Sequence, residues 1–100
     1  MEKHDEILLK IKERPSLYLG KKSLTLLHVF LGGYDTCYYD YFEKTAKTSF
    51  DGFEEFIRAK YNASKSYFNW AGNILNNTKT EEEAFDKFFE LYDEFLSQKS

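Results

Sequence analysis

The sequence predicts an all-α protein: a single compact, bundle-like domain of about five helices that covers residues 1–100. Along most of the chain, apolar residues recur at spacings of three and four, as on one face of a helix, and strand-like alternation never exceeds a few residues. Apolar residues make up 42% of the chain and charged residues 31%, a balance that supports a closed core and argues against disorder. The ten Phe, eight Tyr and one Trp are expected to build most of that core.

The first predicted helix covers residues 3–13, where three apolar side chains share one face and charged residues occupy the rest. Pro15 disfavours helical geometry at the residue before it, so the helix is expected to end there. Residues 16–20 are expected to form an extended or turning connector, in which Gly20 can adopt a positive φ.

A longer second helix is predicted from Ser23, a favourable N-cap residue, to about Tyr41. Its apolar positions recur at helical spacing: Leu24, Leu27, Leu31, Tyr34, Tyr38 and Tyr41. Gly32 and Gly33 interrupt the pattern, and each costs about 1 kcal/mol relative to alanine inside a helix. We expect another backbone segment to pack closely against this pair, rather than the helix to break.

A third helix is predicted after a polar linker at residues 44–49, because residues 51–54 resemble a capping box. A small hairpin between residues 44 and 52 remains an alternative for this part of the chain. A fourth, short helix carries Trp70 and is expected to end at residues 76–77, where asparagine tolerates the left-handed conformation of a helix stop.

The final helix is the clearest of the predicted elements. Thr80 and Glu83 have the spacing of a capping box, in which two side chains satisfy the first backbone N–H groups of a helix. Aromatic and apolar residues then form a wide stripe at helical spacing as far as Leu96. The helix should therefore bury one face and expose the other.

Charge and hydropathy argue against several functions. A net charge of −3 removes the attraction to phosphates that general nucleic-acid binding needs, so we expect no direct contact with DNA or RNA. No apolar run approaches the length of about 20 residues that a membrane span requires. The first residues lack the pattern of a secretory signal and Cys37 is the only cysteine, so we expect a cytoplasmic location.

Residue types suited to metal binding or catalysis are sparse. His4 and His28 are the only histidines, and no metal-ligand spacing links them. If Cys37 and His28 were a nucleophile and its base, nine residues along one helix would place them about 13 Å apart. We therefore expect no metal, no cofactor and no enzymatic activity, and we expect Cys37 to be buried and structural.

The string Arg-Pro-Ser-Leu-Tyr-Leu-Gly at residues 14–20 is the most distinctive in the chain. It resembles the Arg-Pro-x-Met-Tyr-Ile-Gly motif of the gyrase-type ATPases, in which that segment helps to line a nucleotide pocket. The resemblance implies an upstream acidic base with an asparagine that binds magnesium, and a downstream Asp-x-Gly-x-Gly loop, and this chain has neither. We expect a structural role, in which Pro15 stops a helix and Gly20 turns the chain.

Acidic residues are concentrated in the last predicted helix. Between Glu81 and Glu94 there are seven acidic residues and one lysine, a local balance of −6. Six of these acids lie opposite the aromatic stripe, and we call them the acidic ridge: Glu82, Glu83, Asp86, Glu90, Asp93 and Glu94. Such a run is most often a solvated helix face, but it can also complement a basic partner and steer its approach. The acidic ridge is the candidate partner-binding site.

A pattern of mainly apolar residues extends over most of the chain, with its most distinctive part near the N-terminus. The residues of the pattern are Arg14, Pro15, Tyr18, Leu19, Gly20, Ser23, Leu24, Leu27, Phe30, Leu31, Gly33, Tyr34, Phe53, Phe56, Tyr61, Trp70, Phe88 and Phe89. In these residues the chain resembles small bacterial immunity proteins of contact-dependent growth inhibition and related polymorphic toxin systems. The resemblance implies a cytoplasmic inhibitor that binds and blocks a cognate toxin C-terminal domain, often a nuclease.

The acidic ridge suits such a partner, because it can occupy the position of a phosphate backbone in a positive substrate groove. Two other functions remain as alternatives. The chain can be an adaptor or homodimerising module whose aromatic surface around Tyr38, Tyr39 and Phe42 takes up a partner helix. It can also be a small enzyme, for which a deep pocket with converging carboxylate and histidine groups would be the sign.

Overall fold

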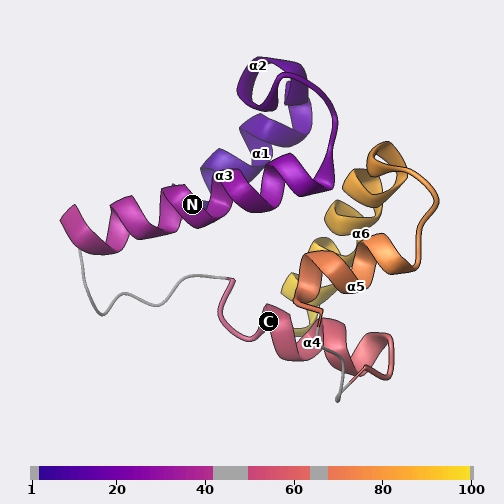
Figure 1. The fold of residues 1–100 in the computed structure, drawn as a ribbon. Helices are drawn as coiled ribbons and strands as arrows, with labels where there is room; N and C mark the ends of the chain where they lie inside the picture. Colours follow the sequence, from indigo (N-terminus) through magenta and orange to yellow (C-terminus); the bar gives the residue numbers. More distant parts are fainter. Residues whose placement is uncertain (1–2, 42–49, 64–67, 100) are drawn as a thin grey trace.

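The computed structural model of the chain describes residues 3–41, 50–63 and 68–99, which form six helices (Figure 1). The helices are α1 (Lys3–Glu13), α2 (Pro15–Leu19), α3 (Leu24–Tyr41), α4 (Phe53–Lys60), α5 (Trp70–Asn76) and α6 (Glu81–Lys99). These three ranges contain no strand, so the all-α prediction is confirmed. The Cα radius of gyration is 13.4 Å, close to the value of about 13 Å for a compact chain of this length.

The connector expected at residues 16–20 is instead the short helix α2, so that prediction was wrong. Pro15 does end α1, because Arg14 leaves helical geometry at φ −138° and ψ 64°. The same proline then begins the next helix, since its fixed φ suits the first helical position and its missing N–H is not needed there. Gly20 follows α2 with φ 84°, and its N–H donates to the carbonyl oxygen of Ser16 at 3.0 Å.

The start of α3 agrees with the sequence analysis. The Ser23 hydroxyl accepts a hydrogen bond from the backbone N–H of Leu26 at 3.2 Å, as an N-cap residue does. Leu24, Leu27 and Leu31 are buried, at the spacings of three and four that predicted the helix. The first half of α3 is therefore held against the core by its leucines.

The glycine pair in α3 does not mark close packing, which corrects the expectation from the sequence. Gly32 and Gly33 are exposed, and a Cβ added to either would meet no atom within 4 Å. The second half of α3 projects beyond the other helices (Figure 1). The helix continues through the pair because a helical backbone forms its own hydrogen bonds and Leu31, 3% exposed, holds the preceding turn in the core.

The start of α4 also differs from its prediction, because residues 51–54 do not form a capping box. Gly52 is the N-cap residue with φ 92°, and no side chain caps the helix. The Glu54 carboxylate instead accepts a hydrogen bond from the backbone N–H of Trp70 at 3.0 Å. The hairpin alternative falls mainly on residues 42–49, which lie outside the described residues, while residues 50–52 form a turn.

Side chains cap both α5 and α6. The Asn69 amide oxygen accepts a hydrogen bond from a first-turn N–H of α5, whereas Asn77 at its end has φ −111°, so the left-handed stop expected there is absent. The Thr80 hydroxyl accepts from the N–H of Glu83 at 3.0 Å, and the Glu83 carboxylate accepts from the N–H of Lys79 at 3.1 Å. The capping box of α6 is therefore confirmed, with its return bond shifted to the residue before the cap.

Aromatic rings of α4, α5 and α6 occupy the centre of the core. Phe53 is fully buried, and its ring centroid lies 4.8–6.1 Å from those of Phe50, Phe56, Trp70, Phe88, Tyr92 and Phe95. Leucine and isoleucine side chains of α1 and α3 complete the cluster. Because this packing holds one face of α6 inside the protein, it also determines which face of α6 reaches the surface.

Candidate protein-binding surface

The acidic ridge lies on one side of α6, opposite the buried aromatic stripe. Its six residues fall within an arc of about 120°, since each residue turns an α-helix by about 100°. Five of the six side chains are exposed and Glu94 is half-buried. The structure therefore places five of the six ridge residues at the surface, while the role of the ridge in partner binding stays a prediction.

Two lysines from distant parts of the chain lie along one edge of the ridge. Lys22, which precedes α3, has its Nζ 2.8 Å from the carboxylate of Asp86. Lys12 of α1 has its Nζ 3.8 Å from the carboxylate of Asp93. No local sequence pattern indicates these pairs, because only the tertiary fold brings Lys12 of α1 and Lys22 before α3 against α6.

Two further lysines lie along the other edge. Lys60 of α4 is 2.8 Å from Glu94, and Lys87 of α6 is 3.3 Å from Glu90. The three lysines outside residues 81–94 change the local balance from −6 to −3, so the surface is less acidic than the sequence indicates. Exposed ion pairs contribute only about 0–1 kcal/mol each, so a basic partner can replace these lysines at small cost.

The remaining members of the ridge differ in role. Glu83 belongs to the capping box of α6, and its carboxylate bonds the Lys79 N–H. Glu82 makes no hydrogen bond or ion pair with the part of the chain that the structure describes. The ridge therefore contains one structural carboxylate, one unoccupied carboxylate and four that pair with lysines.

Glu81, which the sequence analysis leaves out of the ridge, connects α6 to the N-terminus of α3. Its carboxylate accepts hydrogen bonds from the Ser23 hydroxyl at 2.9 Å, and from the Thr25 N–H at 2.9 Å and hydroxyl at 2.6 Å. Burial raises the pKa of Glu81, but the hydrogen bonds from Thr25 and Ser23 outweigh burial and hold the pKa below its usual value. This carboxylate is already occupied and is a structural residue.

A groove beside the ridge runs along α6. At one end α1 forms its other side, and at the other end Lys12, Pro15 and Lys22 do. Its two ends have volumes of 240 Å³ and 630 Å³ and share Lys12, Phe89 and Asp93, so we call them together the α1–α6 groove. Its apolar floor consists mainly of Leu8, Leu9, Phe85, Phe89, Tyr92 and Leu96. Its charged rim consists of Asp5, Lys12, Lys22, Asp86, Glu90 and Asp93. Three ridge residues therefore line a surface that also offers apolar contact.

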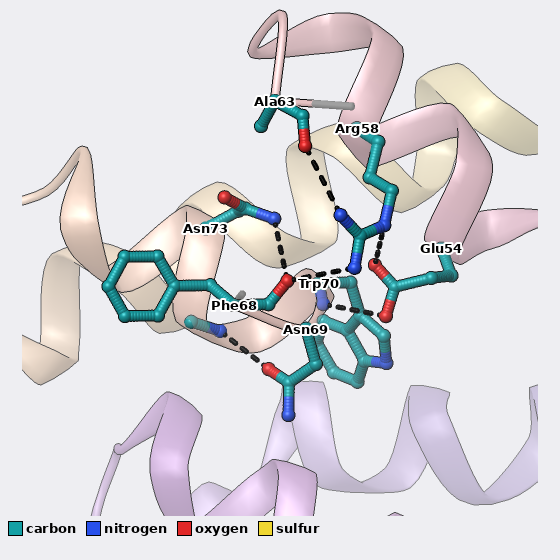
Figure 2. Close-up of polar contacts among 8 residues, drawn as sticks. Glu54, Arg58, Ala63, Phe68, Asn69, Trp70 and Asn73 are labelled. Carbon is teal, nitrogen blue, oxygen red and sulfur yellow. Dashed lines mark hydrogen bonds and ion pairs between the residues drawn. The ribbon is translucent and has the colours of Figure 1, made fainter. Parts of the chain in front are cut away.

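A polar network between α4 and α5, which the sequence analysis did not predict, is shown in Figure 2. The Arg58 guanidinium donates to the carbonyl oxygens of Ala63 at 3.2 Å and Phe68 at 3.1 Å. Its Nε lies 3.5 Å from Glu54, whose other carboxylate oxygen accepts from the Trp70 N–H. The four-residue spacing of Glu54 and Arg58 in the sequence indicates their ion pair. The hydrogen bonds of Arg58 to the carbonyl oxygens of Ala63 and Phe68 cannot be predicted from spacing, because they depend on how the chain folds after α4. The network positions α5 relative to α4.

Cys37 and His28, the other candidates from the sequence, both lie on α3. Cys37 is exposed on α3, so the expectation of a buried cysteine was wrong, because the second half of α3 projects from the core. His28 is half-buried with its ring against Trp70, at a centroid distance of 5.1 Å and an angle of 82°. Within the described ranges, no group of three or more His, Cys, Asp or Glu side chains is arranged to hold a metal ion.

Two further expectations concern the second half of α3 and the membrane. The Tyr38 and Tyr39 side chains, and the whole of Phe42, lie outside the described residues. None of the described helices has the length and apolar character needed to cross a membrane.

The ridge and the α1–α6 groove thus remain as the candidate protein-binding surface. Comparison of the chain with protein-family models, with curated proteins and with solved structures finds no match.

Proposed function

We propose that this protein is an immunity protein: a cytoplasmic inhibitor that binds a cognate bacterial toxin domain, a nuclease, and blocks it by protein–protein interaction rather than by catalysis. The observation that carries the proposal is the outer surface of α6, where acidic side chains border an apolar groove. The resemblance of the sequence to immunity proteins supports a toxin as the partner. A cytoplasmic location suits an inhibitor that meets its toxin inside the cell.

The two parts of the surface make different contributions to binding. Carboxylates on the rim attract the basic substrate groove of a nuclease and raise the association rate, an effect that salt screens. The apolar floor contributes the contact area that a partner desolvates, which charges alone do not supply. Ridge carboxylates then occupy the region in which the nuclease would hold phosphates, and nucleic acid is excluded.

The first experiment is a pull-down from the native host with the tagged protein as bait, followed by mass spectrometry and a nuclease assay on the retained material. We expect recovery of a toxin C-terminal domain whose nuclease activity disappears when the protein is bound. Recovery of the protein itself alone, or of a regulator without nuclease activity, would overturn the proposal in favour of a homodimer or an adaptor.

A charge-reversal variant then tests the surface. Changing Asp86, Glu90 and Asp93 to lysine is expected to slow association with the recovered toxin at least about tenfold at low salt. At 1 M salt, where the Debye length is about 3 Å, much of this difference should vanish. The measurement is surface plasmon resonance at several salt concentrations.

The matched control reverses three exposed acids on other elements: Glu13, Asp51 and Glu55. Both triple variants change the net charge by the same amount, so a general charge effect slows them equally. A slower association confined to the Asp86, Glu90 and Asp93 variant supports the surface on α6, and equal rates for the two variants reject it.

A further inference from the structure

The α1–α6 groove has a length that suits a particular kind of segment. Along α6, the floor extends from Phe85 to Leu96, which is about 16 Å at a rise of about 1.5 Å per residue, or three helical turns. Leu9 of α1 lines the floor of the groove. Its side chain is 44% exposed, because the described residues cover it only in part. At the end lined by Leu8 and Leu9, α1 and α6 enclose an apolar seam, and such a seam between two helices can receive a third helix.

Two lysines cover the floor of this groove in the free protein. Lys12 Nζ lies 5.7 Å from the centroid of the Phe89 ring, and Lys22 Nζ lies 5.9 Å from the centroid of the Phe85 ring. The same two ammonium groups neutralise Asp93 and Asp86 on the rim. The longer of these ion pairs, at 3.8 Å between Lys12 and Asp93, is also solvent-exposed on both sides, so it is the easier one to replace.

We infer that the α1–α6 groove binds one amphipathic, basic helix of the partner, about three turns long. The inference rests on the proposed function and names the segment of the toxin that the surface recognises. Between Glu81 and Glu94 the acidic side chains still exceed the basic ones by three after Lys12, Lys22 and Lys60 are counted, so this face of α6 is negative and selects a basic helix. A basic side chain of that helix replaces Lys12 in the ion pair with Asp93. Lys12 then moves off the Phe89 ring, and apolar side chains of the partner helix pack on Leu9 and Phe89.

A synthetic peptide tests this recognition without the toxin. The probe is a fluorescein-labelled, helix-stapled peptide about twelve residues long, with leucines four and then three residues apart and arginine or alanine elsewhere. Its affinity is measured by fluorescence anisotropy against a pair of leucine variants. Leu9→Ala removes a floor side chain, whereas Leu17→Ala removes a leucine that is 67% exposed on α2 and does not line the groove.

We expect Leu9→Ala to weaken peptide binding about tenfold, the effect of losing roughly 1.4 kcal/mol of contact, and Leu17→Ala to change it less than about twofold. Both variants keep the net charge, so a non-specific electrostatic complex responds to neither. Equal affinities for the two variants would overturn the groove as the binding site.

A pair of lysine variants tests the displacement step. Lys12→Ala removes the competitor for Asp93 and is expected to tighten peptide binding about threefold to tenfold. Lys10→Ala is the matched control, because it is an exposed lysine of the same helix that does not line the groove and makes the same change in net charge. Equal effects of the two lysine variants would reject displacement of Lys12.

The recovered toxin separates this inference from the proposed function. If the toxin is captured and inhibited but Leu9→Ala binds it as tightly as Leu17→Ala, the groove assignment fails and the immunity function stands. If no toxin is recovered while the peptide still distinguishes Leu9 from Leu17, the immunity function fails and the groove is a site for another basic helix. Loss of toxin inhibition in Leu9→Ala alone supports both.

Discussion

Three consecutive glutamates at the start of α6 have three different roles. Glu81 accepts hydrogen bonds from Ser23 and Thr25, Glu83 completes the capping box, and Glu82 faces solvent. Identical side chains thus differ because successive residues of a helix point about 100° apart. Only Glu81 points at the N-terminus of α3, where free backbone N–H groups and the helix dipole favour a negative charge.

Glu81→Gln should lower stability at pH 7 by about 1–2 kcal/mol, because an amide oxygen accepts hydrogen bonds less strongly than a carboxylate and its NH₂ group faces other donors. The pKa of Glu81 is lowered in the folded protein, so its contribution is present above the ordinary value of about 4.3. That contribution is lost as the pH falls through the lower folded value. Urea denaturation from pH 7 to pH 2 should therefore show a flatter acid limb for Glu81→Gln than for the wild type.

The neighbouring substitution Glu82→Gln is the control for this prediction. It removes the same charge from the same helix turn, but no described group bonds Glu82. Its stability should stay within about 0.5 kcal/mol of the wild type at every pH, as for an ordinary surface substitution. Similar pH profiles for the two variants would contradict the assigned role of Glu81.

At the scale of elements, a capping box read from the sequence formed only where its side chains had no competing partner elsewhere in the fold. Thr80 caps α6 as the sequence predicts, because its hydroxyl has the first-turn N–H of Glu83 within reach. The equivalent signal before α4 failed because Glu54 bonds the Trp70 N–H and Arg58 instead, and Gly52 begins the helix with a positive φ. Tertiary partners thus compete with local capping for the same carboxylate.

The glycines of α3 give a prediction at this scale. Gly33→Ala should raise the free energy of unfolding by about 0.5–1 kcal/mol, because alanine favours helix and its Cβ would meet no atom within 4 Å. Gly20→Ala is the contrasting variant: its φ of 84° strains an L-residue by roughly 1–2 kcal/mol. In thermal melts followed by circular dichroism, Gly33→Ala should raise Tm and Gly20→Ala should lower it. A lower Tm for Gly33→Ala would contradict the finding that the space beside Gly33 is empty.

The junction of α4 and α5 gives a second prediction for elements. Arg58→Lys should lower stability by about 1–3 kcal/mol, because one ammonium group cannot reach Ala63, Phe68 and Glu54 together. Lys60→Ala, on the same helix, removes only an exposed ion pair with Glu94 and should cost less than about 1 kcal/mol. Urea titrations of the two variants compare them directly, and equal losses would mean that the network adds nothing.

At the scale of the whole molecule, one aromatic cluster links helices that are far apart in sequence. Phe53 of α4 contacts Trp70 of α5 and Phe88 of α6, with centroid distances of 5.5 Å and 5.6 Å. Side chains of α1 and α3 pack against the same cluster. The described helices therefore share one core, and unfolding should be a single cooperative transition.

Phe53→Ala should lower the free energy of unfolding by about 3–5 kcal/mol, because it leaves a cavity at the centre of the ring cluster. Trp70, the only tryptophan, reports on the core by fluorescence, while circular dichroism reports on all helices. The two signals should change together in the wild type and in the variant. Phe68→Ala, at a half-exposed ring, should cost much less, and a loss equal to that of Phe53→Ala would place the core elsewhere.

The sequence by itself determined the helical class, five of the helices and the buried face of α6, because helix periodicity and caps depend on residues only three or four apart. It also placed the acidic ridge at the surface. Tertiary structure decided the charge around the ridge, through Lys12, Lys22 and Lys60, and decided that Glu81 is structural. It alone formed the α1–α6 groove, because a groove needs two helices to pack, and that packing depends on contacts between residues distant in the chain.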